Sequence, residues 1–178
     1  MAWFDKNSER EHLELFLSAR EYAVGERLTF VANSESPDFV CKRPSGILVG
    51  VEHTKIEYDP ERTEILEACG AYVGELDNFG IIWAACRAIE LKEQKRQRPQ
   101  WKYPDATVLV LDLPEGYRLE DWPTDSGLSS EFSKSGFIEI WISDHSSIEA
   151  YDEVTLIGLY PKSNWGIRGQ GYLWGVPK

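Results

Sequence analysis

The chain has 178 residues, a formal net charge of −11 at pH 7, and 42% apolar and 28% charged residues. These totals suit one soluble domain with a sizeable core, and the acidity argues against a broad basic face that grips bare duplex DNA. No apolar run is long enough for a transmembrane helix and the N-terminus carries no signal-peptide stretch, so a cytoplasmic protein without membrane contact is expected.

In chain order, the apolar patterns predict a helix over 8–24 and a strand over 27–32. A hairpin over 36–56 follows, then helices over 61–72 and 78–98. Strands are predicted at 107–113, 137–142 and 154–160, while 161–178 shows no clear period. The expected fold is α/β, a mixed β-sheet flanked by helices in one domain over 1–178. Its core spans about 8–160, interrupted by a polar excursion at 114–134.

The hairpin brings two carboxylates together. Its turn, 42–46, contains Pro44 and Gly46, which suit a short hairpin loop. Asp38 and Glu52 are equally far in sequence from Ser45, so a turn centred there places them opposite each other, with Cβ atoms about 4.5–5.5 Å apart. Two bare carboxylates at that distance repel, and the arrangement therefore predicts a bound cation.

Strand alternation decides which neighbours share this face. Gly50, Glu52 and Thr54 point with Asp38, whereas Lys55 points to the other face. On the helix over 78–98, Lys92 continues an apolar stripe, where it either reaches the carboxylates or extends along the edge of the stripe to solvent.

The segments Pro37-Asp38 and Gly50-Val51-Glu52-His53-Thr54-Lys55 resemble the core of the restriction-endonuclease-like, PD-(D/E)XK, nuclease superfamily. The order of elements over about 8–113 is similar as well: a helix containing Glu9, three strands, and a helix that crosses to a buried strand. The resemblance implies a restriction-endonuclease-like fold. It also implies a metal-dependent endonuclease or exonuclease that hydrolyses phosphodiester bonds.

Roles follow from the resemblance. Asp38 and Glu52 would bind Mg²⁺ (or Mn²⁺), His53 would add its backbone carbonyl, and Glu9 would reach the metal through water. Glu9 equally suits the positive N-terminus of its helix. The sequence departs from the family in having Thr54 where the lysine belongs. Either a bulge turns Lys55 inward or Lys92 supplies the charge; otherwise the site binds metal only or is inactive.

A basic stretch follows the helix. Its candidate contacts to nucleic acid, with DNA expected first, are Lys95, Arg96, Arg98, Trp101 and Lys102. The cations would meet phosphates and Trp101 would stack on a base. The alternative is a solvated helix end, where cations favour the helix dipole.

Other residue motifs in the sequence give weaker indications of function. Asp144-His145-Ser146 are adjacent and cannot form a hydrolytic triad among themselves, and the glycines of 166–171 lack the context of a phosphate loop. Buried reduced thiols are expected and a structural zinc site is not, because both residue types are scattered: Cys41, Cys69, Cys86, His12, His53 and His145.

A second function class stays open. It is a catalytically inactive member of the same fold that binds a protein partner or acts as an immunity factor. A third reading is a non-nuclease α/β protein in which Asp38 and Glu52 cap turns and face solvent.

Overall fold

The computed structural model describes residues 6–56, 78–114, 132–145 and 153–172. A seven-stranded mixed sheet, in the order β1-β2-β3-β4-β5-β6-β7, runs through these residues. Its strands are Thr29–Asn33, Phe39–Lys42, Leu48–Lys55, Thr107–Asp112, Glu139–Asp144, Glu153–Tyr160 and Arg168–Tyr172. The central pairs β3·β4 and β4·β5 are parallel, and the outer pairs are antiparallel.

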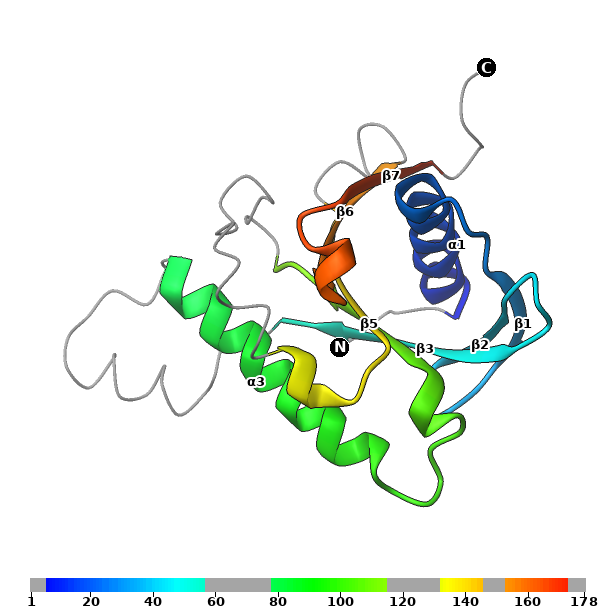
Figure 1. The fold of residues 1–178 in the computed structure, drawn as a ribbon, viewed down its shortest axis with the longest axis horizontal. Coiled ribbons are helices and arrows are strands. Elements are labelled where there is room, and N and C mark those ends of the chain that lie inside the picture. Colours follow the sequence, from blue (N-terminus) through cyan, green and yellow to red (C-terminus); the bar gives the residue numbers. More distant parts are fainter. Residues whose placement is uncertain (1–5, 57–77, 115–131, 146–152, 173–178) are drawn as a thin grey trace.

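Two helices cover the two faces of the sheet. The sheet curls around α1 (Lys6–Val24), while α3 (Asn78–Arg96) lies against the opposite face (Figure 1). Each helix closes its own apolar core: one contains Phe16, Val51 and Trp141 on the α1 side, the other Ile81, Ile89 and Leu111 on the α3 side. Every residue of β4 and β5 is buried, as expected for central parallel strands covered on both faces.

The mixed α/β prediction is confirmed. The described helices and most strands lie within a few residues of their predicted positions, although β5 begins two residues later than predicted. Residues 161–178, for which no element was predicted, contain the strand β7. The predicted helix over 61–72 and most of the excursion at 114–134 lie outside the described residues. No described helix is long and apolar enough to cross a membrane.

Glycines in β7 let α1 pack directly on the backbone. A Cβ built on Gly171 would lie 2.1 Å from the carbonyl oxygen of Leu15, and one on Gly169 would lie 2.1 Å from that of Ala19. Both contacts involve helix backbone, which cannot rotate away as a side chain can. Gly169 and Gly171 therefore allow close packing of α1 on β7. This packing accounts for the two glycines without a phosphate loop.

Gly171→Ala is expected to destabilise the fold by about 1–3 kcal/mol or more, because the added methyl group forces α1 away from the sheet. Chemical denaturation measures the change. Gly46→Ala is the matched control, since nothing lies within 4 Å of its Cβ position and only its φ of 88° opposes the substitution. Equal stability losses in the two variants would contradict this packing argument.

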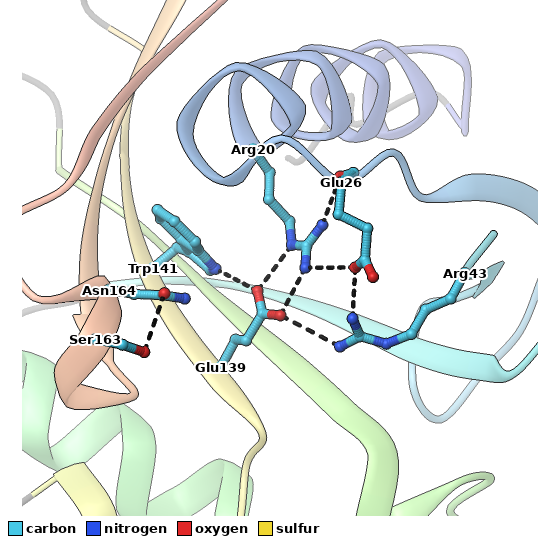
Figure 2. Close-up of polar contacts among 7 residues, drawn as sticks. All are labelled: Arg20, Glu26, Arg43, Glu139, Trp141, Ser163 and Asn164. Carbon is cyan, nitrogen blue, oxygen red and sulfur yellow. Dashed lines mark hydrogen bonds and ion pairs between the residues drawn. The ribbon is translucent and has the colours of Figure 1, made fainter. Parts of the chain in front are cut away.

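A buried ion network ties α1 to the middle of the sheet (Figure 2). Arg20 donates two hydrogen bonds to the carboxylate of Glu139, at 2.8 and 2.7 Å. Trp141 donates its indole N–H to the same carboxylate at 2.8 Å. Arg43, from the β2–β3 turn, and Glu26, from the loop after α1, complete the network. Burial alone would lower the pKa of Arg20, but Glu139 and Glu26 outweigh it and raise the pKa, so the guanidinium stays charged.

The two cysteines in the described residues, Cys41 and Cys86, are free thiols, as expected. Cys41 is fully buried between α1 and the sheet, and burial raises the pKa of its thiol to about 12. Cys86 is half-buried, and Cys69 lies outside the described residues. A thiol with so high a pKa is a poor nucleophile, and Cys41 is therefore a packing residue.

Candidate functional site

The β2–β3 hairpin has the register that the turn predicted. Phe39 pairs with Val51 and Val40 pairs with Gly50, and the same register extended by one residue sets Asp38 opposite Glu52. The two are joined directly, because the backbone N–H of Asp38 donates to Glu52 Oε2 at 3.0 Å. Asp38 in turn accepts the backbone N–H of His53 on Oδ2 at 2.9 Å. The paired carboxylates are therefore held by backbone contacts on both strands.

Glu52 is buried. Only 4% of its surface is exposed, so the reading in which it faces solvent at a turn is wrong. Burial raises the pKa of Glu52, the nearby Asp38 raises it further, and Lys92 opposes both effects. A buried carboxylate beside a second carboxylate is unfavourable without a cation close by.

Lys92 supplies such a cation from the helix. Its ammonium group forms an ion pair with Glu52 Oε1, and its side chain is 16% exposed. The apolar residues at the same helical spacing, Ile81, Ala85 and Ile89, are buried in the core on the α3 side. The periodic stripe therefore brings Lys92 over the sheet at Glu52.

A cleft opens on the other side of Asp38. It has a volume of about 230 Å³, and it is lined by Glu9, His12, Asp38, Phe39, His53, Thr54, Lys55 and Asp112. Five of these were predicted as site residues: Glu9, Asp38, His53, Thr54 and Lys55. Glu9 lies on the exposed part of α1 rather than in the core. Asp38 stands between the open cleft and the buried pair of Glu52 and Lys92.

Gly50 leaves room beside the carboxylates, and Pro37 fills it. A Cβ on Gly50 would lie 2.4 Å from Pro37 Cγ and 3.1 Å from Thr107 Oγ1. The proline thus packs flat on β3 immediately before Asp38. This contact fixes the chain at the point where the first carboxylate leaves the sheet.

The basic stretch offers fewer side chains for contact with nucleic acid than predicted. Trp101 is 6% exposed and donates its indole N–H to Thr107 Oγ1 at 3.1 Å, so its ring is not available to stack on a base. Arg96 is bound to Glu93 and to the carbonyl oxygen of Pro104. Of the five predicted nucleic-acid contacts, Lys95, Arg98 and Lys102 remain on the surface.

The end of this stretch lies close to the site. The backbone N–H of Lys102 donates to the carbonyl oxygen of Ser36 at 2.8 Å, two residues before Asp38. The exposed Lys102 therefore stands at the same end of the hairpin as the carboxylate pair. This is the one part of the basic stretch that the structure brings beside the candidate site.

Asp112 and His12 line the cleft although neither was among the predicted site residues. Asp112 pairs in register with Lys55 across β3·β4. Burial would raise the pKa of Asp112, but hydrogen bonds from His145 and His53 outweigh it and lower the pKa, so this carboxylate is ionised. An acidic residue at the end of a buried apolar strand is a signal that could have indicated Asp112.

Cation binding can be judged from the donors present. Among the described residues, no group of three or more His, Cys, Asp or Glu side chains is arranged to hold a metal ion as it stands. Mg²⁺ needs fewer protein ligands, because it is commonly held by one or two carboxylates and keeps several waters. Asp38 and Glu52 provide two, beside a cleft with room for the waters.

Comparison with protein-family models, with curated proteins and with solved structures returned no match.

Proposed function

We propose that the protein is a metal-dependent nuclease of the restriction-endonuclease-like fold, which hydrolyses phosphodiester bonds. The observation that carries the proposal is the joined pair of Asp38 and Glu52, with Lys92 on the second oxygen of Glu52. The order of elements supports it: a helix, an antiparallel three-strand meander, and a helix that crosses to a parallel buried strand.

Each residue has a role in this proposal. Asp38 and Glu52 hold Mg²⁺ (or Mn²⁺), which when bound positions and activates a water for attack on phosphorus. Lys92 opposes the rise in the pKa of Glu52 and places positive charge near the developing negative charge of the phosphoryl group. Lys55 lines the cleft beside Asp38 and attracts the phosphate backbone.

Substrate binding must overcome the acidity of the chain. The formal net charge of −11 repels a polyanion at long range, and metal bound at Asp38 offsets part of this charge locally. The exposed Lys95, Arg98 and Lys102 are the cations of the basic stretch that remain for phosphate contacts, and Lys102 lies at the hairpin. A short contact to one strand suits this distribution better than a wide footprint on duplex DNA.

The test is cleavage of single-stranded and plasmid DNA in Mg²⁺. Wild type is expected to cleave, and Asp38→Asn is expected to lose on the order of 10³-fold in rate, because several kcal/mol of charge stabilisation depend on the metal. Asparagine still accepts the His53 N–H, so the hairpin is preserved. Glu35→Gln, at an exposed acid three residues earlier, is the control and should keep full activity. Equal cleavage by wild type and Asp38→Asn would rule the proposal out.

One observation favours a second candidate, an inactive member of the fold that binds a protein partner. The Lys92 ammonium already neutralises Glu52, so the buried pair is satisfied to a large extent without a metal ion. A wild-type protein that folds, shows no cleavage of DNA or RNA in Mg²⁺ or Mn²⁺, and shows no thermal response to either ion supports this candidate.

A further inference from the structure

All three histidines of the sequence lie around one buried carboxylate. His12 comes from α1, His53 from β3, and His145 directly follows β5, while the carboxylate is that of Asp112 at the end of β4. His145 Nε2 lies 2.9 Å from Asp112 Oδ1, and His53 Nδ1 lies 3.8 Å from the same oxygen. Histidine is the side chain whose charge changes most readily near neutral pH, so protons act directly on this contact between α1 and the sheet.

A ring stack joins α1 to the cluster. The His12 imidazole lies against that of His145, with ring centroids 4.5 Å apart and an angle of 26° between the ring planes. Neutral rings can stack at this distance, whereas two imidazolium ions repel each other. His12 also lines the cleft that contains Asp38, together with Glu9, which lies one turn earlier on α1. The stack therefore holds in place the part of α1 that lines the cleft.

The cluster has no acceptor ready for a further proton. Asp112 is ionised and can only accept hydrogen bonds, so His145 Nε2 carries the proton that it donates to this carboxylate. A further proton on His145 would go to Nδ1, which is buried and has no hydrogen-bond partner among the described residues. His53 Nε2 is buried without a partner as well. Protonation of either nitrogen would create a buried N–H donor without an acceptor, which is unfavourable.

The groups that face His12 disfavour a positive charge on its ring. Burial and, next, the nearby His145 lower the pKa of His12 to about 4. His53 and Lys55 from β3 lower the pKa as well, and Asp112 from β4 opposes them. An exposed histidine has a pKa of about 6.5, so His12 takes up a proton more readily once its ring has left the cluster.

We propose that the stack of His12 on His145 is a pH-sensitive switch, which opens at acidic pH and frees the first turns of α1 from the sheet. The rest of the helix stays in place, because Phe16 is fully buried in the core and Arg20 is paired with Glu139. The opening is therefore local, and it occurs where the helix lines the cleft.

Opening widens the cleft, since the wall formed by Glu9 and His12 moves away from Asp38. The pKa of His12 is about 4 in the stack and rises toward about 6.5 when the ring is free. The ratio of open to closed protein is therefore constant above about pH 6.5, rises about tenfold for each pH unit below it, and levels off near pH 4. This equilibrium belongs to the free protein and does not depend on nuclease activity.

The test is amide hydrogen exchange followed by NMR from about pH 7.5 to about pH 4.5, with each rate corrected for the intrinsic effect of pH. Protection of the amides at 10–13 in wild type is expected to fall about tenfold for each pH unit below about pH 6.5. Amides near Arg20 should keep their protection, since the ion pair with Glu139 does not open. Protection at 10–13 that is independent of pH would overturn the proposal.

His12→Phe isolates the proton from the ring. Phenylalanine keeps an aromatic ring for the stack and cannot be protonated, so protection at 10–13 should not change with pH in this variant. Circular dichroism at neutral pH establishes that the variant is folded, and a folded His12→Phe that loses protection as wild type does would contradict the switch. If His12→Phe does not fold, His145→Phe decides in its place. Loss of the facing imidazole should raise the pH at which the His12 ring titrates in NMR spectra, and an unchanged midpoint would overturn the proposal.

Discussion

Lys92→Met is expected to lower the rate of phosphodiester cleavage about 10²–10³-fold, the usual effect of removing one group that stabilises transition-state charge. Lys92 is the cation paired with Glu52, and it lies in the apolar face of α3. Without it the charge of Glu52 is buried beside Asp38 with no paired cation, which raises the pKa of Glu52 further. The pH at which cleavage sets in should therefore move upward, and a pH–rate profile measures both effects.

Two other lysines serve as comparisons. Lys95→Met, three residues further along α3 at an exposed position, should change the rate no more than about twofold. Lys55→Met removes a cation that lines the cleft, and its effect should appear in substrate affinity, with a salt dependence, rather than in the pH profile. A greater rate loss in Lys55→Met than in Lys92→Met would show that Lys55 is the catalytic lysine.

Glu139→Gln is expected to reduce the free energy of unfolding by about 3–5 kcal/mol, because it leaves the buried charge of Arg20 without its main partner. The side chains of Arg20 and Glu139 are 3% and 8% exposed, and together they connect α1 to β5. The same carboxylate accepts from Trp141 and contacts Arg43, so its loss affects the β2–β3 turn as well. Urea denaturation monitored by tryptophan fluorescence measures the change.

Glu90→Gln is the matched control for the ion network. Its partner Arg87 is 45% exposed and Glu90 itself 59%, so water screens this pair and its loss should cost less than about 1 kcal/mol. A Glu139→Gln variant as stable as Glu90→Gln would mean that the network in Figure 2 contributes little to folding.

The local parts of the site could be predicted from sequence, because short-range periodicity determines them. The turn at Pro44 and Gly46 fixed the register that sets Asp38 opposite Glu52, and the helical spacing of α3 brought Lys92 to the same face. Alternation predicted that Lys55 points away from Asp38, whereas the structure has Asp38, Thr54 and Lys55 lining one cleft.

The features that could not be predicted from the sequence depend on long-range packing. A basic stretch ending in Trp101 looks like a surface patch in sequence, but the ring turns inward to Thr107. β7 escaped prediction because its alternate glycines serve contact with α1 and carry no apolar period. His12, His53 and His145 come from three separate elements, so only the folded sheet shows that they meet at Asp112.

We propose that Asp38 and Glu52 hold a divalent cation, and thermal unfolding in Mg²⁺ measures this binding. At 100 times its dissociation constant, an ion that binds only the folded chain adds about 2.7 kcal/mol, which corresponds to a rise of roughly 5–10 °C in the melting temperature. Wild type is predicted to show this rise, and Glu52→Gln is predicted to show none. An equal rise in both proteins, or no rise in wild type, would contradict the claim.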